Sequence, residues 1–287
     1  MKLNQIATII KGQDGVVWKN EIFRFDHLGN CNVYNLNELV SGEITNLNPT
    51  ATFTLDKAEL IMPHSNATFW GAHYYAKSDE FPLLYTNVYN SPANFNDNIM
   101  GACCVYRLER NGNGFITTLV QIIQIGFTED CNLWKASPEK HGVRPYGNFV
   151  IDREQGFYHA FVMRNEELGT RHFKFKIPPI TKGYMDPNYN VKRVILTKED
   201  ILEQFDCPFQ NYVQGATIYN GKLYSTEGFS DSVIRPAIRV INLNNRKEEK
   251  HVDLWEMGYH IEPEFIDFEN GVCYYGDSEG NLYTIEF

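Results

Sequence analysis

Residues 212–229 read YVQGATIYNGKLYSTEGF, and this stretch decides the fold. Two short runs of strand-forming residues flank Asn220-Gly221, a dipeptide strongly preferred in two-residue hairpin turns. The stretch therefore predicts an antiparallel β-hairpin. Fainter copies of it recur along the chain, and their arrangement predicts the architecture.

Four further stretches repeat this hairpin, and the starts of successive copies lie 49 to 76 residues apart. Self-similarity at a period of about 50 residues is typical of radial or solenoid arrays. More strand-like sequence follows each copy, so each unit supplies four strands, except the last, which supplies three. The other copies are DGVVWKNEIFRF (14–25), WGAHYYAKSDEFPLLYTNVY (70–89), YGNFVIDREQGFYHAFV (146–162) and PEFIDFENGVCYYG (263–276).

The strand missing from the last unit is available at the other end of the chain. QIATIIK (5–11) precedes the first hairpin, and pairing with LYTIEF (282–287) would close a ring and remove its exposed edge. We therefore expect an all-β fold, a five-bladed β-propeller with four-stranded antiparallel blades, in a single domain over 1–287. The expected blades are 14–56, 66–126, 144–196, 212–254 and 260–287 with 5–11; the third ends in VKRVIL (191–196).

Two connections carry helical signals. Thr197 is a capping hydroxyl followed by early acidic residues and then by apolar residues at helical spacing, which predicts a helix over TKEDILEQF (197–205). NLNELVSG (35–42) predicts another helical turn. Both segments are interpreted as connectors between blades.

Charge and hydropathy exclude some classes of partner. The 36 acidic and 26 basic residues give a net charge of −10, which disfavours nucleic acid because a phosphate backbone would be repelled. There is no apolar run of about 18 residues, so we expect no membrane span, and the N-terminus lacks the pattern of a secretory signal. The chain as given is therefore expected to be a cytoplasmic protein or a soluble protein without a targeting signal.

The six cysteines are scattered and form no C-x-x-C pair. Cys103 and Cys104 are neighbours on an expected strand, where they would point to opposite faces. We expect reduced, mostly buried thiols and no cofactor, and a divalent cation such as Ca²⁺ stays open beside the acidic residues discussed below.

The repeat alignment also predicts where a site lies. In a propeller, the starts of the innermost strands and the loops between second and third strands line the mouth of the central channel. Acids, amides, arginines and aromatic residues meet there, a mixture that suits a glycan or another small polar molecule. The expected ligand-binding residues are Asp14, Trp70, Arg144, Tyr146, Tyr212, Gln214, Arg235, Glu262 and Glu264.

Each of these residue types has an expected role. Trp70 and Tyr146 would be stacking platforms, Arg144 would bind an anionic group, and Gln214, with acids such as Asp14, would form hydrogen bonds. Glu227 lies on the second strand of its hairpin, away from the mouth, and is a weaker candidate. The loops would add Asn94, Phe95, Asp97 and Asp231, and the strand starts Gln13, Asn66 and His260.

Two other functions stay open on the same sequence. Glu262 and Glu264 are spaced by two, which puts both on one face of a strand, where like charges raise one pKa, as acid–base chemistry or cation binding would use. An enzyme would use Glu264 or Asp14 as its general acid or base. A protein partner bound on the faces of the disc is the third reading, because propellers host all three functions.

The segment QGATIYNGKLYSTEGFSDSVIR resembles the signature of plant-type glutaminyl cyclotransferases, which are five-bladed propellers. The likeness covers about 25 residues of one blade. It implies cyclisation of N-terminal glutamine, although Ser225 follows Tyr224 here and Glu227 stands two positions beyond the family's glutamate.

A second resemblance rests on QGATIYNGKLY and EPEFIDFENGVCYYG, which are similar to units of phage and bacterial surface-lectin propellers. Gln214, Gly215, Glu262 and Glu264 match, and Phe265 replaces the family's glycine. The likeness covers two of five blades and implies recognition of cell-wall glycans by a lectin-like, bacterial or phage protein.

Overall fold

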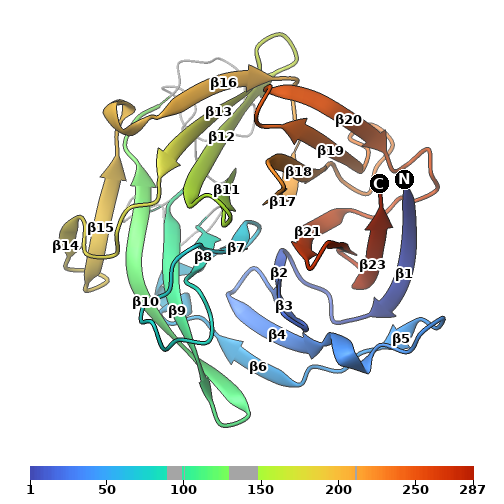
Figure 1. Ribbon diagram of the computed structural model, residues 1–287, viewed down its shortest axis with the longest axis horizontal. Helices are drawn as coiled ribbons and strands as arrows, with labels where there is room; N and C mark the ends of the chain where they lie inside the picture. The colour runs from blue at the N-terminus through green and yellow to red at the C-terminus, as the bar shows by residue number, and fades with distance from the viewer. Residues whose placement is uncertain (89–98, 100, 129–147, 211) are drawn as a thin grey trace.

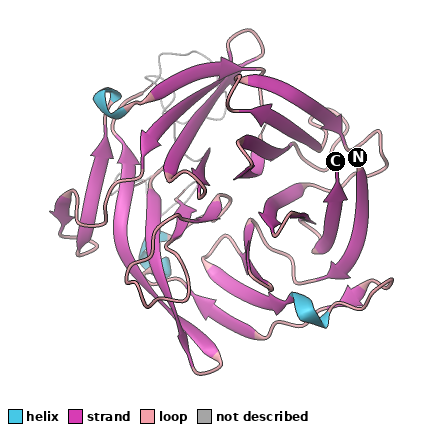
Figure 2. Ribbon diagram, viewed as in Figure 1, coloured by secondary structure: helices cyan, strands magenta, loops and turns pink. Residues whose placement is uncertain are grey.

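The computed structural model describes residues 1–88, 99, 101–128, 148–210 and 212–287. Five β-sheets stand around a central axis like the blades of a propeller, and helix is confined to short turns (Figures 1 and 2). The prediction of a five-bladed, all-β propeller built from four-stranded antiparallel blades is confirmed.

Blades 1 and 3 have four strands each, and blade 2 carries two more at its outer edge. Blade 1 contains β2 (Gly15–Trp18), β3 (Glu21–Phe25), β4 (Asn30–Asn35) and β6 (Ala51–Thr54). Blade 2 contains β7 (Thr68–Trp70), β8 (Leu84–Asn87), β9 (Cys103–Asn111) and β10 (Gly114–Ile125), extended outward by β15 (Val191–Leu196) and β14 (Tyr184–Asp186). Blade 3 contains β11 (Asn148–Asp152), β12 (Phe157–Asn165), β13 (Gly169–Lys176) and β16 (Glu203–Cys207).

The last two blades follow the expected order. Blade 4 contains β17 (Val213–Tyr219), β18 (Lys222–Glu227), β19 (Ala237–Asn242) and β20 (Lys247–Asp253). Blade 5 contains β21 (Pro263–Glu269), β22 (Val272–Asp277), β23 (Asn281–Glu286) and β1 (Lys2–Thr8), with β5 (Thr45–Asn46) at its edge.

The hairpin turn that predicted the fold has the expected backbone. Asn220 and Gly221 have φ of 50° and 69°, and Asn270 and Gly271 in blade 5 have 50° and 82°. Two successive residues with positive φ define the turn that matches the twist of paired strands, and Asn-Gly adopts it at least cost. The same local chemistry therefore starts both blades.

The N-terminal strand closes the ring. β1 pairs antiparallel with β23, from Lys2 opposite Glu286 to Thr8 opposite Asn281, so the two chain ends lie side by side (Figure 1). β5 then adds to β1 in parallel, with Thr45 opposite Ala7. The predicted closure is confirmed.

The outer part of the third blade differs from the prediction. VKRVIL (191–196) forms β15, which pairs in parallel with β10 of blade 2, and the fourth strand of blade 3 is β16. The chain thus leaves blade 3 after β13, adds β14 and β15 to blade 2, and returns. The repeat pattern could not reveal this, because a parallel outer strand has the same sequence character as an antiparallel one.

The predicted helix over 197–205 is also wrong beyond its first turn. Thr197 and Asp200 form the expected capping box, but only Lys198–Asp200 is helical, as a 3₁₀ turn labelled η3. The next residues become β16 because the free edge of β13 offers strand pairing to a segment too short for a stable helix. The turn predicted in 35–42 is confirmed as η1 (Leu36–Glu38), and α1 (Ala58–Ile61) is a further short helix.

The described cysteines are buried free thiols, as expected for Cys31, Cys103, Cys104, Cys207 and Cys273. Cys131 lies outside the described residues. Across the ranges that the structure describes, no helix is long and apolar enough to cross a membrane.

Candidate functional site

The innermost strands all begin on one face of the disc, which we call the start face and which carries Asp14, Gln214 and Glu264. Because neighbouring strands of a blade are antiparallel, the loops between second and third strands reach the same face. The sequence prediction places its site here.

Asp14 is buried and joins two blades. Its carboxylate accepts hydrogen bonds from its neighbour Gly15 N at 2.8 Å and from Thr68 N of blade 2 at 2.6 Å. Burial raises the pKa of Asp14 well above its usual value, although these amide donors oppose that shift. The geometry fits a bond between inner strands better than the predicted contact with a ligand.

Asp267, farther along its inner strand, joins blades 4, 5 and 1 in a similar way. It accepts from Val17 N of blade 1 at 2.8 Å and from Thr217 Oγ1 of blade 4 at 3.0 Å. It lies two residues after Phe265 on the inner strand β21, where it is buried. Buried carboxylates therefore tie the inner strands together around the channel.

Trp70 lies in the core and presents no face to a ligand. Its side chain is 2% exposed and forms an aromatic cluster between blades 1 and 2, with Phe23 at 5.2 Å and Phe81 at 5.7 Å between ring centroids. We call Trp18, Phe23, Trp70, Phe81 and Phe115 the aromatic seam. The predicted stacking role does not fit this burial, since neighbouring rings already cover the indole.

Glu264 and Arg24 are both buried and interact electrostatically without direct contact. Glu264 is 3% exposed, and its Oε2 has no hydrogen-bond partner in the described part of the chain. Arg24 donates from Nη2 to the carbonyl oxygens of Gly12 and Asp277 at 2.8 and 3.0 Å, while its Nε and Nη1 are buried without such a partner among the same residues. Burial raises the pKa of Glu264 to about 8, although the positive charge of Arg24 lowers it.

Four half-buried or buried side chains meet where β17 starts, and we call Tyr212, Gln214, Phe229 and Glu262 the β17 corner. Gln214 Nε2 donates to Glu262 Oε1 at 2.7 Å and to the Gly228 carbonyl at 3.3 Å. Gly228 N in turn donates to the Tyr212 carbonyl at 3.0 Å, and the rings of Tyr212 and Phe229 lie 4.6 Å apart. Three predicted site residues are thus brought together here.

Burial partly shields the Glu262 carboxylate. It raises the pKa of Glu262, and the hydrogen bond from Gln214 opposes that rise. The backbone of Glu262 is held as well, because its N–H donates to Ser230 Oγ at 2.7 Å. The carboxylate is therefore fixed at the edge of the corner while it keeps partial contact with solvent.

Arg235, in the loop between β18 and β19, lines a surface cavity. Its Nη1 lies 3.1 Å from Asp253 Oδ2 and 2.5 Å from Glu256 Oε1. The adjoining cavity measures about 380 Å³, and Glu227 and Arg239 are in its wall. The arginine is thus held by two acids, not by an axial ligand site.

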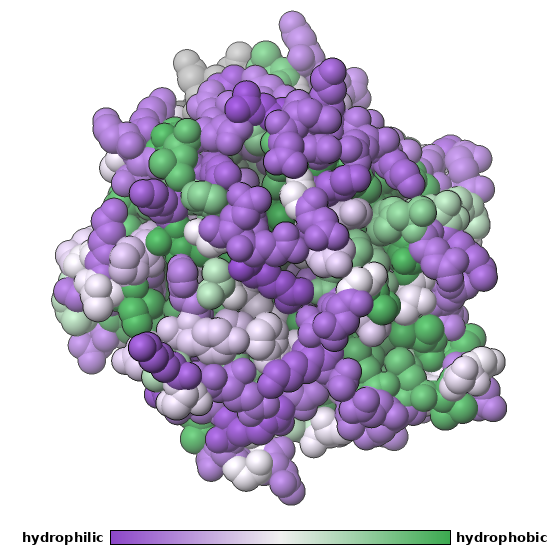
Figure 3. All heavy atoms as spheres, viewed as in Figure 1, coloured by the Kyte–Doolittle hydropathy of each residue, from purple (hydrophilic) through white to green (hydrophobic). Residues whose placement is uncertain are grey.

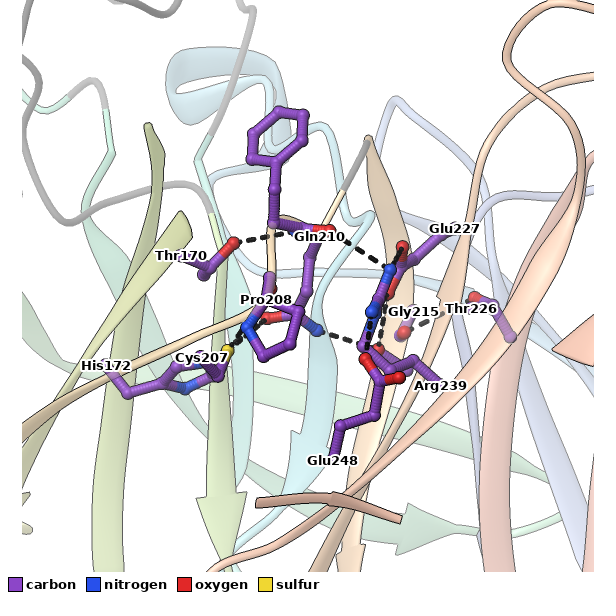
Figure 4. Close-up of polar contacts among 12 residues, drawn as sticks. Thr170, His172, Cys207, Pro208, Gln210, Gly215, Thr226, Glu227, Arg239 and Glu248 are labelled. Atoms are coloured by element: carbon purple, nitrogen blue, oxygen red, sulfur yellow. Dashed lines mark hydrogen bonds and ion pairs between the residues drawn. The ribbon is translucent and has the colours of Figure 1, made fainter. Parts of the chain in front are cut away.

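Glu227 belongs to a polar network between blades 3 and 4, which Figure 4 displays. Its carboxylate accepts from Arg239 Nε at 2.7 Å and Nη2 at 3.1 Å, and Arg239 also contacts Glu248. Gln210 lies on the other side, where its Nε2 donates to Ser225 Oγ at 2.8 Å. The weaker standing that the sequence gave Glu227 agrees with this paired, 2% exposed position.

The network continues into blade 3 through His172. Its Nε2 lies 3.1 Å from Gln210 Oε1 and 3.2 Å from Cys207 Sγ, and its ring is stacked between Phe161 and Phe205. Burial lowers the pKa of His172 to about 4 and raises that of Cys207 to about 12, so neither forms the ion pair of a reactive thiol at neutral pH. We call His172, Cys207, Gln210, Ser225, Glu227 and Arg239 the polar seam.

Several predictions fall outside the described residues. These are Arg144 and Tyr146 at the third inner strand, and Asn94, Phe95 and Asp97 in the loop after β8. Within the described ranges, no group of three or more histidine, cysteine or acidic side chains is arranged to hold a metal ion.

The buried charges Arg24 and Asp267, and the polar seam apart from Glu227, were missed from sequence. Arg24 sits in FRF, between buried aromatic residues, and a charge inside an apolar strand could have pointed to it. DHLGN (26–30) and DSEGN (277–281) carry another signal: in each, the aspartate accepts from two backbone amides and from the asparagine side chain. These repeated turns are structural.

Hydrophilic side chains cover most of the face in Figure 3, and hydrophobic ones gather over β1 and β5. At this edge the side chains of Ile10, Val40 and Ile44 are each at least half exposed. They lie on the outer rim, away from the β17 corner.

No family model matches the chain, and no curated protein matches it either. Similar solved structures include a glutaminyl cyclase from Myxococcus xanthus (TM-score 0.47, 12% identity, covering 100% of this chain and 94% of that one). The WD40 β-propeller domain of Doa1 matches with a TM-score of 0.45 and 10% identity over 99% and 97% of the two chains. BamB from Moraxella catarrhalis matches at 0.35 and 7%, over 97% and 60%. At these scores the likenesses carry no argument about function.

Proposed function

We propose that the protein is a ligand-binding propeller that recognises a glycan or another small polar molecule on its start face, at the β17 corner. The observation that carries the proposal is the half-buried Glu262 carboxylate, held by Gln214 at 2.7 Å beside the paired rings of Tyr212 and Phe229. A fixed acceptor next to aromatic surface is what a sugar-like molecule needs, since hydroxyls bind the carboxylate and C–H faces cover the rings.

The corner is ordered before any ligand arrives. Gly228 N donates a hydrogen bond to the Tyr212 carbonyl, and Phe229 N donates to the Ile234 carbonyl at 2.8 Å. Ser230 Oγ accepts from Glu262 N. Gly228 has φ of 88°, and a Cβ there would lie 2.0 Å from the Arg235 carbonyl oxygen, so glycine is required. A preorganised site loses less conformational entropy on binding.

Isothermal titration calorimetry against a panel of neutral oligosaccharides and cell-wall fragments tests the proposal. We expect saturable binding to at least one member of the panel, weakened about tenfold or more by Phe229→Ala and by Glu262→Gln, which corresponds to about 1.4 kcal/mol or more. Glu59→Gln, on the exposed surface of α1, is the matched control and should bind as the parent does. Absence of binding across the panel, or binding that both corner variants retain in full, would refute the proposal.

A second candidate function is catalysis at the same face, and the state of Glu264 favours it. A carboxyl with a pKa of about 8 stays protonated at neutral pH, as a general acid must. If glycan ligands from the panel are also cleaved, Glu264→Gln should abolish turnover while binding persists. Binding without turnover by the parent protein supports recognition alone.

A further inference from the structure

A cavity of about 590 Å³ lies at the outer rim of blade 2, far from the β17 corner in the fold. Its walls come from the end of β10, from the added strands β14 and β15, and from η3. This volume is within the range of small-molecule sites in proteins. The residues that matter for its chemistry are Gln124, Phe127, Tyr184, Arg193, Ile195 and Lys198.

The cavity exists because of the excursion of the chain from blade 3 to blade 2. β15 pairs in parallel with β10, and β14 folds back on β15 with Tyr184 opposite Arg193. Gly183 has φ of 105°, and a Cβ there would lie 2.2 Å from the Arg193 carbonyl oxygen. Only glycine allows this close return of the hairpin.

The charge of the cavity wall is opposite to that of the whole protein. The chain carries a net charge of −10, yet the described lining residues include Arg193 and Lys198 and no acid. Lys198 Nζ lies 5.7 Å from the centre of the Phe127 ring, so an aromatic surface adjoins the cation. The wall therefore favours a negatively charged guest.

Arg193 supplies a buried, incompletely satisfied donor. It is 8% exposed, and its Nε lies 2.8 Å from Asp186 Oδ2, although the N–H direction does not make that contact a hydrogen bond. Its Nη2 is buried with no hydrogen-bond partner in the described ranges. Because Arg193 also lines the cavity, its guanidinium is well suited to a carboxylate or phosphate oxygen there.

Tyr184 adds a second aromatic ring at the cavity, and this one is exposed, with 51% of its surface accessible. We infer that this rim cavity binds a small anionic molecule with a planar ring, whose carboxylate or phosphate faces Arg193 and Lys198 and whose ring lies against Tyr184 and Phe127. The inference is independent of the function proposed for the start face.

Titration calorimetry of the full chain tests the inference with two matched pairs of probes: 2-naphthoate with 2-naphthamide, and adenosine 5′-monophosphate with adenosine. We expect saturable binding of at least one anion, at least tenfold tighter than its neutral partner and weakened by added salt. The pair that shows the preference identifies the anion as carboxylate or phosphate.

Two variants locate the site without removing the partner of buried Asp186. Lys198→Gln should weaken anion binding at least fivefold, and Tyr184→Ser should weaken the anion and its neutral partner alike. Lys77→Gln, another exposed lysine of blade 2, is the control and should leave affinity unchanged. No binding of either anion at millimolar concentration, equal binding of charged and neutral probes, or affinity unaffected by both variants would each overturn the inference.

Discussion

The aromatic seam and the polar seam each lie between neighbouring blades, yet they are built from opposite chemistry. Between blades 1 and 2, five large rings lie edge to face or stacked, with centroid separations of 5.2 to 5.9 Å around Trp70. Between blades 3 and 4, an ion pair, an amide, a thiol and an imidazole form one connected network (Figure 4).

The difference teaches what the repeat does and does not specify. Each seam must exclude water, and either packed aromatic rings or paired polar groups can fill it. The two solutions fail differently: a lost ring leaves a cavity, while a lost partner leaves a buried charge or dipole unsatisfied.

Removing the central ring of the aromatic seam should have the largest effect on stability. We expect Trp70→Ala to lower the free energy of unfolding by about 4 kcal/mol, because a fully enclosed indole leaves a cavity that the neighbouring rings cannot fill. Urea unfolding monitored by circular dichroism measures this. Tyr74→Ala, at a ring with 44% exposure, should cost far less, and a loss under 1 kcal/mol for Trp70→Ala would disprove the packing role.

Breaking the ion pair of the polar seam should cost slightly less and be repairable. Among the described residues, Glu227→Ala leaves buried Arg239 with Glu248 as its acidic partner, and we expect a loss of about 3 kcal/mol. Replacing both partners, as Glu227→Leu with Arg239→Met, should restore most of the loss, because an apolar pair of similar volume needs no counter-charge.

The same urea series for the parent, Glu227→Leu, Arg239→Met and the double variant gives the coupling between the two side chains. A double variant no more stable than Glu227→Ala would show that the network is needed for more than charge balance. The aromatic seam offers no such repair, so this cycle is the sharpest contrast between the two seams.

The sequence was sufficient to predict the closed circle of blades, because hairpin turns and period-two strands are local signals that the blades repeat. It was insufficient for the seams. The repeat alignment gives Trp70 and Gln214 corresponding positions, but Trp70 ends the inner strand β7 and is enclosed by rings from residues 23 and 81. Gln214 lies near the start of β17 and reaches Glu262 of the next blade. Exposure at these positions depends on side chains tens of residues away, which alternation along one strand does not encode.

The outer strands of blades 2 and 3 show the same limit. Residues 191–196 and 203–207 both have strand character, and only the spatial neighbours of β10 and β13 decide which blade each one joins. The rim cavity forms because residues 191–196 join blade 2, and no sequence motif indicates it. Gln214 and Glu262 could be named from sequence because a repeated strand start indicates where their backbones lie, and their role in binding stays a prediction.

Acid should weaken the polar seam and leave the aromatic seam unaffected, which is the smallest of the three effects. Burial lowers the pKa of His172 from 6.5 to about 4, so between these values the unfolded chain binds a proton that the folded chain does not. Stability from this residue is therefore complete above pH 6.5 and is lost as the pH falls toward 4. Between pH 7 and pH 5 the loss is about 2 kcal/mol.

His159 is buried in the same blade with a pKa lowered to about 3, so it adds to the acid sensitivity of the parent. Comparison with His172→Phe isolates one residue: the variant keeps a ring between Phe161 and Phe205 and should lose about 2 kcal/mol less than the parent between pH 7 and pH 5. Urea unfolding at both values measures the difference, with exposed His27→Phe as control. Equal losses in the parent and His172→Phe would mean that His172 is not held neutral by the seam, since only a depressed pKa links its burial to acid unfolding.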